Sequence, residues 1–225
     1  MTRRFRSIVK DSNFYDEQAN EEFTVIDEES GKKTQRRCYF YNIDLQGRLF
    51  LEDTFPKNIA TSIKDERFLD FFFRRIQPID DKMRTFMQQR KIPIRDYPYV
   101  SPCGKELNFI RPAALPVVFH TLLDRKELVY GGTLRQTFDW RDLAVSRTTG
   151  RIYHSLGNAD APTIMTHGLI RSQLAITLAE RMEATEDGNG SETLGLRIDD
   201  ENVMAIPWLP SEVEPGNWAM PVGYK

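Results

Sequence analysis

The residues best suited to chemistry are concentrated between positions 97 and 112. This segment holds Cys103, one of only two cysteines in the chain, followed by Glu106 and Asn108. Cys103 lies between a proline and a glycine, residue types that define the backbone of a tight turn. A thiol beside a cation or an imidazole can ionise and act as a nucleophile, and Glu106 could then serve as a general base. The alternative is that Cys103 is a small apolar residue filling space in the turn.

Two arginines predict a binding site for an anion. Arg111 closes the same segment, close to the amide of Asn108, and Arg171 lies at the start of an expected helix, directly before Ser172. A guanidinium combined with the unpaired N–H groups of a helix N-terminus is well suited to phosphate or carboxylate. The alternative is that each arginine forms an ion pair with an acidic side chain and fixes a loop.

The histidines predict no metal site. The chain has three, His120, His154 and His167, and no two of them have the i,i+4 spacing of a helical zinc site. No Cys-x-x-Cys motif, phosphate loop or nucleophile elbow is present in the sequence, so no cofactor is expected. His154 follows an expected strand and is the best candidate for a general acid or base, although a structural histidine at the end of a strand is the alternative.

Short strands joined by tight turns are expected to position these residues. Aromatic and branched residues flank Asp- and Gly-containing turns in three segments, 39–52, 128–134 and 143–153. Gly131-Gly132 is a two-residue hairpin turn, and tight turns such as these join neighbouring antiparallel strands. A further strand is expected over 194–198 or 203–206. The repeated hairpin pattern therefore predicts antiparallel pairing.

Two helices are expected to cover the sheet. Asp65 is a suitable N-cap, an apolar stripe through Phe72 follows, and Pro78 ends the first helix. Apolar residues recur every four positions through the second helix, expected over 166–182. We therefore predict an α+β fold, in which an antiparallel sheet built from hairpins is covered by two main helices. The predicted organisation is a charged, poorly ordered arm over 1–37, a single domain over 38–207 and an irregular tail over 208–225.

Composition restricts the classes of partner. The formal net charge of −2 lacks the basic excess typical of DNA-binding proteins, so DNA is not an expected partner. No apolar stretch reaches the ~20 residues of a membrane span, so none is expected. One local exception is the basic segment 82–95, a loop or short helix. With Tyr97 and Tyr99 available for stacking, this segment could contact RNA.

The N-terminus gives two opposed indications of location. The first ten residues hold four basic residues and no acidic one, like the start of a mitochondrial presequence, but residues 11–30 hold eight acidic residues. We expect a mitochondrial protein, with the cytoplasm as the alternative. Two cysteines without an evident secretory signal indicate free thiols in a reducing compartment.

Several motifs, in a fixed order over roughly residues 38–180, resemble uncharacterised protein family 0598, a family named in people for a chromosome 8 open reading frame. They are Tyr39-Phe40-Tyr41, Gly47-Arg48-Leu49-Phe50-Leu51, Ser101-Pro102-Cys103-Gly104, Gly150-Arg151-Ile152-Tyr153-His154 and Gly168-Leu169-Ile170-Arg171-Ser172. The resemblance implies a protein of unknown function, with a mitochondrial location as in the family's animal members.

Three functional hypotheses follow from these residues. The leading one is a non-enzymatic binding or assembly protein that recognises a partner or an anionic ligand through the 97–112 turn and the 168–172 helix start. The second is an enzyme acting on a small phosphorylated or carboxylated substrate, with Cys103 or His154 as the catalytic group. The third is RNA contact through 82–95. Whether the protein is an enzyme stays open.

Overall fold

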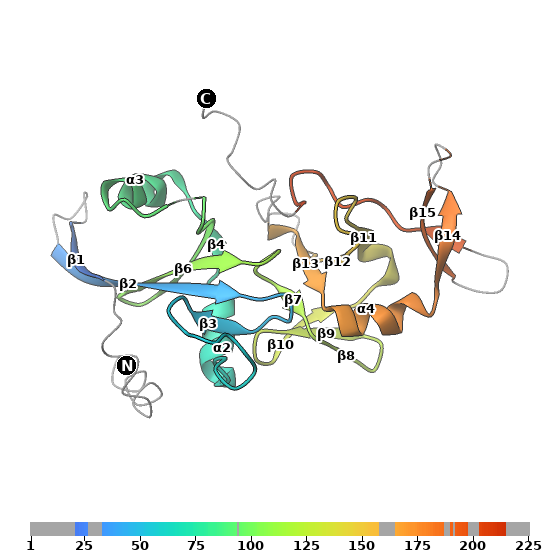
Figure 1. Cartoon of the computed structure of the whole chain (residues 1–225), viewed down its shortest axis with the longest axis horizontal. Helices are drawn as coiled ribbons and strands as arrows, with labels where there is room; N and C mark the ends of the chain where they lie inside the picture. The colour runs from blue at the N-terminus through green and yellow to red at the C-terminus, as the bar shows by residue number, and fades with distance from the viewer. Residues whose placement is uncertain are drawn as a thin grey trace. The chain divides into compact units, whose positions relative to one another are not determined.

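A computed structural model describes residues 21–26, 33–93, 95–157, 165–186, 190, 192–197 and 203–214 (Figure 1). The chain folds into two compact units. The first unit comprises Met1–Asn42 and Leu49–Arg111, and the second comprises Ile43–Arg48 and Pro112–Lys225. The single domain over 38–207 stays a prediction, and each unit is described separately below.

The first unit is built on a sheet with the strand order β1-β2-β6-β5-β4, and β3 pairs with β2 beside this path. Its strands are β1 (Glu21–Ile26), β2 (Lys33–Ile43), β3 (Leu49–Leu51), β4 (Gln77–Pro78), β5 (Tyr99–Cys103) and β6 (Glu106–Pro112). The pairs of β5 with β6 and of β1 with β2 are antiparallel. The predicted strand, turn and strand over 39–52 are thus confirmed as β2 and β3.

The first predicted helix is confirmed as α2 (Glu66–Phe73). The Asp65 side chain caps it by accepting a hydrogen bond of 2.7 Å from the backbone N–H of Phe68. Leu69, Phe72 and Phe73 form its buried face, and α2 contacts β5. Apolar spacing and a capping residue were therefore sufficient to predict both this helix and the face that packs on the sheet.

The basic segment forms a second short helix in this unit, α3 (Asp81–Gln89), capped by Asp80. Its Met87 is fully buried and packs in a core with Tyr97, Leu107 and Phe109. Met83, Phe86 and Ile92 also pack against this core, so the segment is anchored to the first unit by its apolar side chains, while most of its charged side chains are exposed.

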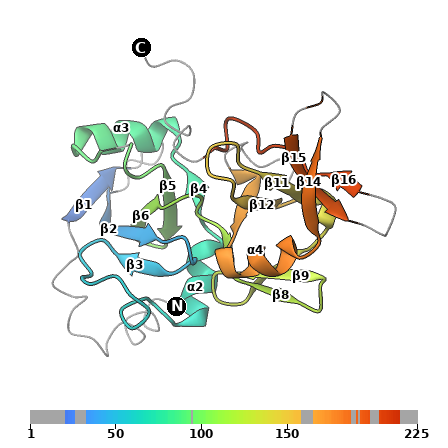
Figure 2. The same cartoon turned by 45° about the vertical axis from the view of Figure 1, so that its right-hand side comes forward.

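The second unit contains three smaller sheets, with strand orders β11-β12-β13-β7, β10-β9-β8 and β14-β15-β16. Their strands are β7 (Val118–Phe119), β8 (Thr121–Leu123), β9 (Glu127–Tyr130), β10 (Leu134–Thr137), β11 (Leu143–Val145), β12 (Ile152–Ser155), β13 (His167–Ile170), β14 (Met182–Glu186), β15 (Glu192–Arg197) and β16 (Val203–Ala205). A 3₁₀ turn, η1 (Trp140–Asp142), precedes β11. The helix α4 (Ser172–Ala179) lies beside β14 (Figure 2).

The predicted hairpins of this unit are confirmed, with one exception to antiparallel pairing. β9 pairs with β10, and β11 pairs with β12, both in antiparallel register. The exception is β13, which pairs with β7 in parallel. One buried apolar cluster includes side chains from β7, β11, β13 and β15, namely Phe119, Val145, Ile170 and Leu196. Strands of different sheets therefore share the core of this unit.

The second helix, predicted over 166–182, is wrong at both ends, since a strand occupies its first part and Met182 at its end begins β14. Residues 167–170 form the buried strand β13, and only 172–179 are helical. The reason is close strand packing: a Cβ atom on Gly168 would lie 2.5 Å from Cε2 of Phe119 and 2.9 Å from Cγ1 of Val117. Glycine therefore permits an approach between β13 and β7 that any larger side chain would block. The period-four apolar pattern continued through this strand, which concealed the boundary.

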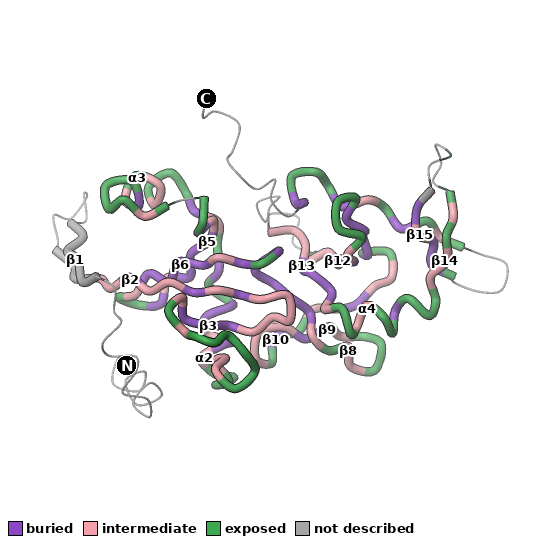
Figure 3. Tube along the Cα trace, viewed as in Figure 1, coloured by how far each residue is buried: buried purple, intermediate pink, exposed green. Residues whose placement is uncertain are grey.

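The predicted fold class is also wrong. In the residues that the structure describes, four separate sheets and only three short α-helices replace one antiparallel sheet covered by two main helices. The protein is mostly β. The short hairpin strands bury their apolar side chains against other strands, so most of the core needs no helical layer (Figure 3).

The segment after β16 is fixed to the second unit by a buried carboxylate. Glu214 accepts hydrogen bonds of 2.7 Å from the Ser146 hydroxyl, the Thr148 hydroxyl and the backbone N–H of Arg147. Burial opposes ionisation of Glu214, but these hydrogen bonds prevail and lower its pKa. The predicted irregular tail over 208–225 is therefore attached up to this residue, and 215–225 lie outside the described residues.

The predicted N-terminal arm over 1–37 lies largely outside the described residues, which include β1 and the start of β2 within that range. None of the described helices is both long enough and apolar enough to span a membrane.

Candidate functional site

Cys103 lies at the end of β5 with its thiol in a buried polar cluster. Its Sγ is 3.4 Å from Oγ of Ser101, and the Ser101 hydroxyl donates a 2.8 Å hydrogen bond to the carbonyl oxygen of Phe72. The thiol is therefore placed to donate to Ser101. Burial raises the pKa of the Cys103 thiol, which keeps it protonated near neutral pH. This environment favours the space-filling alternative over a nucleophile.

Glu106 and Asn108 lie opposite Cys103 and Ser101 in the β5–β6 register. The Glu106 carboxylate forms a 2.7 Å ion pair with Arg37. Burial raises the pKa of Glu106, and the positive charge of Arg37 partly opposes that shift. The Asn108 amide donates a 2.9 Å hydrogen bond to the carbonyl oxygen of Ser101, which ties the two strands together. The structure therefore brings three predicted residues together, in contacts that stabilise the turn.

Arg111 lies at the opposite end of β6 and is held by acidic neighbours. It lies five positions beyond Glu106, roughly 16 Å along an extended strand. Its guanidinium lies 3.3 Å from Glu52 and 3.4 Å from Asp96, and it stacks on the Tyr97 ring at 4.8 Å. Burial and the charge of Glu52 raise the pKa of Tyr97 to about 12. Two carboxylates to one guanidinium leave this cluster net negative, which disfavours an anion here.

His154 lies in the core of the second unit. Its ring packs between Phe119, edge-on at 5.9 Å, and Phe138, stacked at 5.4 Å. Nδ1 lies 2.5 Å from the carbonyl oxygen of Ser155, and Nε2 lies 3.1 Å from the backbone nitrogen of Asp139. Nε2 also lies 3.1 Å from the carbonyl oxygen of Asp139, so its contacts with that residue link β12 to the start of η1, whereas the Nδ1 contact stays within β12. Burial lowers the pKa of His154, which favours a neutral ring.

Arg171 and Ser172 lie at the start of α4, as predicted. The backbone N–H of Arg171 donates to the carbonyl oxygen of Phe119, while its Nε atom is buried without a hydrogen-bond partner among the described residues. Ser172 is exposed, and no side chain caps the helix N-terminus. Gly168 pairs with His154 across the sheet, and Arg171 lies three positions beyond Gly168. Three residues of extended strand span roughly 10 Å, which is the separation of Arg171 from the position opposite His154. The roles assigned to all seven sequence-predicted residues stay predictions.

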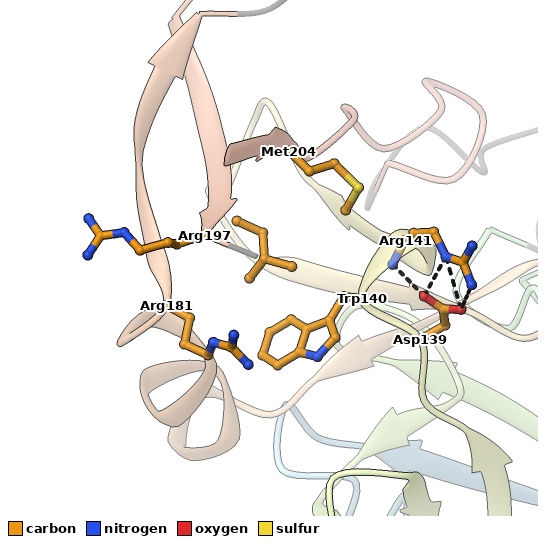
Figure 4. A pocket seen from close by; sticks show the side chains of 7 residues that line it. Asp139, Trp140, Arg141, Arg181, Arg197 and Met204 are labelled. Atoms are coloured by element: carbon orange, nitrogen blue, oxygen red, sulfur yellow. Dashed lines mark hydrogen bonds and ion pairs between the residues drawn. The ribbon is translucent and has the colours of Figure 1, made fainter. Parts of the chain in front are cut away.

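A pocket in the second unit was not predicted from the sequence. Its volume is about 250 Å³, and it lies where η1 meets the ends of β14, β15 and β16 (Figure 4). The lining residues are Asp139, Trp140, Arg141, Arg181, Leu196, Arg197 and Met204. The pocket therefore combines apolar side chains with three guanidinium groups.

The centre of the pocket is the pair formed by Trp140 and Arg181. The Arg181 guanidinium lies 5.2 Å from the centroid of the Trp140 ring, a cation–π distance, and the two side chains lie side by side in Figure 4. Met204 points toward the same space, and Leu196 is buried. An aromatic ring entering the pocket would thus meet an indole, a thioether and an aliphatic side chain close to a positive charge.

Two of the three arginines pair with carboxylates. Asp139 accepts hydrogen bonds from Nε and Nη2 of Arg141, at 3.0 and 2.7 Å, and these bonds lower the pKa of Asp139 to about 2. Arg197 forms an ion pair with Glu183. Among the described residues, the lining of the pocket thus contains three guanidinium groups, one carboxylate and three apolar side chains, and no cysteine or histidine.

The sequence carried only a weak signal for this pocket. Asp139-Trp140-Arg141 places one of the chain's three tryptophans between opposite charges. The remaining lining residues lie 40 or more positions later, Arg181 near the end of the expected second helix and the others beyond it, and no local spacing connects them to Trp140.

Comparison with known proteins identifies a family and two similar structures. A family model described as "Domain of unknown function (DUF4505)" matches residues 29–204. A solved structure of a DUF1285 family protein from Silicibacter pomeroyi is 15% identical, covering 77% of this chain and 84% of that chain, with a TM-score of 0.42. A DUF1285 family protein from Shewanella baltica is 13% identical, covering 62% of this chain and 90% of that chain, with a TM-score of 0.37.

Proposed function

We propose that this protein, a member of the DUF4505 domain family of unknown function, is a non-enzymatic binding protein. Its ligand is a small molecule that carries both an aromatic ring and an anionic group. The ligand occupies the pocket of the second unit. The observation that carries this proposal is the convergence of the Trp140 ring and the Arg181 guanidinium, 5.2 Å apart, in a pocket that Leu196 and Met204 also line.

The two parts of the ligand follow from the two kinds of lining residue. A planar ring gains offset stacking on Trp140 and contact with Met204, as aromatic groups do in most small-molecule sites. A carboxylate, phosphate or sulfonate on that ring gains charge-assisted hydrogen bonds from Arg181. The three arginines among the lining residues disfavour a cationic ligand of the same shape.

The catalytic candidates do not support an enzyme as well as this pocket supports binding. The Cys103 thiol is buried with a raised pKa, and the two ring nitrogens of His154 are both hydrogen-bonded to the backbone. RNA stacking on Tyr97 and Tyr99 loses its support, because both tyrosines are buried. Enzymatic activity and RNA contact therefore remain hypotheses without a specific structural observation.

The start of α4 is a second candidate anion position in the same unit. One observation favours it: the Nε atom of Arg171 is buried and lacks a hydrogen-bond partner among the described residues. An anion there would also receive hydrogen bonds from the first-turn N–H groups of α4, including that of Ser172. This position keeps the anionic-ligand prediction made for 168–172, whereas the acidic neighbours of Arg111 weaken the prediction for 97–112.

Titration with anilinonaphthalene sulfonate tests the pocket, because this probe joins an aromatic group to an anion and fluoresces when bound. We expect Trp140→Ala to weaken binding roughly tenfold through lost stacking. Arg181→Gln should weaken it roughly tenfold through lost charge-assisted hydrogen bonding. Arg135→Gln removes an arginine of the same unit that pairs with Glu127 away from the pocket, and should leave binding unchanged.

Competition completes the test. Phenyl phosphate should displace the probe at lower concentration than uncharged phenol does, since both present the same ring and only one presents an anion. Equal affinity in wild type, Trp140→Ala and Arg181→Gln would refute the proposed pocket.

We also propose a mitochondrial location and membership of uncharacterised protein family 0598, both supported by sequence motifs. The supporting N-terminal residues lie outside the described part of the chain. Import of the chain into isolated mitochondria, with the first ten residues present or removed, tests the location. A chain that stays outside the mitochondria in both cases would support the cytoplasmic alternative.

A further inference from the structure

His154 contacts the residues that precede Trp140 in the chain, behind the wall of the pocket. Its ring stacks on Phe138 with the centroids 5.4 Å apart, and Phe138 meets the Trp140 ring edge-on at 4.9 Å. Asp139, between those two aromatic residues, lines the pocket, as Figure 4 shows. His154 is fully buried and is not a lining residue. It therefore acts on the support of Trp140 and not on the space that a ligand would fill.

The backbone of Asp139 presents two opposite hydrogen-bonding groups to one nitrogen of this ring. Nε2 of His154 lies 3.1 Å from the backbone nitrogen of Asp139 and 3.1 Å from its carbonyl oxygen. Nδ1 lies 2.5 Å from the carbonyl oxygen of Ser155, which can only accept, so Nδ1 carries a proton. In the neutral ring Nε2 is then an acceptor for the N–H of Asp139. In the protonated ring Nε2 is a donor, which can bond only to the carbonyl oxygen.

A change at Asp139 reaches Trp140 through η1. The carbonyl oxygen of Asp139 accepts the backbone N–H of Asp142 at 3.1 Å, and this hydrogen bond closes the 3₁₀ turn that carries Trp140. The Asp139 side chain caps the same turn by accepting the backbone N–H of Arg141 at 2.9 Å. A proton on Nε2 adds a donor to the oxygen that closes η1 and removes the acceptor of the Asp139 N–H. Both changes act on the backbone that positions the indole ring.

The titratable groups around this ring come from η1 and its cap and from β13. Burial lowers the pKa of His154, while its hydrogen bonds to the backbone and the negative charges of Asp142 and Asp139 oppose part of that shift. From β13 comes His167, whose own pKa is lowered by burial and by the neighbouring His154. The other side chains that pack on the ring are the uncharged Phe119 and Phe138.

We propose that His154 is a positioning residue whose protonation controls ligand binding in the Trp140 pocket. The neutral ring accepts the Asp139 N–H and keeps η1 in the conformation that presents the indole. The protonated ring removes that acceptor, η1 shifts, and the affinity for the ligand falls. This inference rests on the proposed binding function and adds its regulation, in which the ligand is held near neutral pH and released on acidification.

Titration with anilinonaphthalene sulfonate at several pH values tests the inference, because a sulfonate stays ionised throughout. The dissociation constant of the wild type should rise at least about threefold between about pH 7.5 and about pH 5. Circular dichroism at each pH selects conditions in which the protein is folded. Binding by Trp140→Ala measures the probe bound outside the pocket and is subtracted.

His154→Gln should bind like the wild type near neutral pH and lose the pH dependence. A glutamine amide oxygen can accept the Asp139 N–H in place of Nε2, but it takes up no proton in this range. His167→Gln is the matched control, since it removes the neighbouring titratable ring and should keep the pH dependence of the wild type.

Proton NMR of the histidine rings is a second measurement, and it needs only the wild type to bind. Binding coupled to a proton is reciprocal, so the bound probe should lower the pH at which His154 titrates. The His154 signal is assigned by elimination with His120→Gln and His167→Gln. This result does not depend on whether His154→Gln folds.

Three results would overturn the inference: an affinity that does not change with pH in the wild type, the same pH dependence in His154→Gln, or a His154 titration that the probe leaves unchanged. If binding near neutral pH still required Trp140 and Arg181, the proposed pocket would stand without this regulation. If no such binding occurred near neutral pH, the pocket itself would be refuted, and the regulation with it.

Discussion

Replacing Glu214 by alanine should destabilise the second unit strongly, because this carboxylate closes the segment after β16 onto the β11–β12 turn. Three donors point at it: the hydroxyls of Ser146 and Thr148 and the backbone N–H of Arg147, each at 2.7 Å. Glu214 is only 4% exposed and Ser146 is fully buried. Alanine would therefore remove the acceptor that these three donors share and leave the buried Ser146 hydroxyl only the weaker contact with Oγ1 of Thr148, 3.1 Å away.

The magnitude follows from these contacts. Hydrogen bonds to a charged group each contribute about 1.5–3 kcal/mol, but Thr148 is exposed enough for water to replace its bond. Counting mainly Ser146 and Arg147, the free energy of unfolding should fall by roughly 3 kcal/mol. Glu214→Gln keeps one acceptor oxygen and should cost roughly 1 kcal/mol. Glu212→Ala, two positions earlier and exposed, should change it by less than about 0.5 kcal/mol.

Urea unfolding followed by tryptophan fluorescence measures this effect. The tryptophans are Trp140, Trp208 and Trp218, so the signal comes from the part of the chain assigned to the second unit. The lowered pKa of Glu214 fixes the pH dependence. The stabilisation that the ionised Glu214 carboxylate provides is complete above the ordinary glutamate pKa of ~4.3. It disappears as the pH falls through the lower pKa that Glu214 has in the folded protein. A loss under about 0.5 kcal/mol for Glu214→Ala at pH 7 would refute this reasoning.

Three further predictions concern other buried groups. Gly168→Ala should lower the free energy of unfolding by roughly 1–3 kcal/mol, because the alanine Cβ would lie 2.5 Å from the Phe119 ring. Thermal unfolding measures this effect, and an unchanged midpoint temperature would show that β13 and β7 can separate without cost. Burial lowers the pKa of His154, so the unfolded state takes up its proton first and stability should decline as the pH falls below ~6.5. His154→Asn should reduce the slope of unfolding free energy against pH in that range by up to about 1.4 kcal/mol per pH unit, and an unaltered slope would mean that this ring does not titrate on unfolding. Native Cys103 should react with iodoacetamide at pH 7 at least about tenfold more slowly than in urea, as followed by mass spectrometry, and equal rates would contradict its burial and raised pKa.

Local patterns predicted the elements whose stabilising contacts are themselves local. The helix that starts at Asp65 has its cap and its buried stripe within one stretch of sequence. The turn at Gly104 requires a positive φ, observed at +65°, which glycine accepts without strain. Such features can be predicted without knowing what lies elsewhere in the chain.

Features set by distant residues could not be predicted in this way. The residues around Gly168 have a helical apolar period, but their state is decided by Phe119 and Val117, about 50 positions earlier. The same limit applied to the arginines. The sequence indicated an anion site at Arg111, and the neighbours that balance its charge, Glu52 and Asp96, come from other segments.

The candidate pocket illustrates the same limit for function. Trp140 and Arg181 are 41 positions apart, and neither belongs to a motif with known chemistry. Their meeting depends on the hairpins between them and on the termination of α4 at Ala179, just before Arg181. Sequence spacing contains this information only through the whole fold of the second unit.

The most direct test of the binding function is an experimental structure of the protein with phenyl phosphate bound. The proposal predicts a ring stacked on Trp140 and a phosphate group within hydrogen-bond distance of the Arg181 guanidinium, inside the pocket that Leu196 and Met204 also line. A phosphate bound at Arg171 and the N-terminus of α4, with the Trp140 pocket empty, would contradict it and assign the anion to the second candidate position.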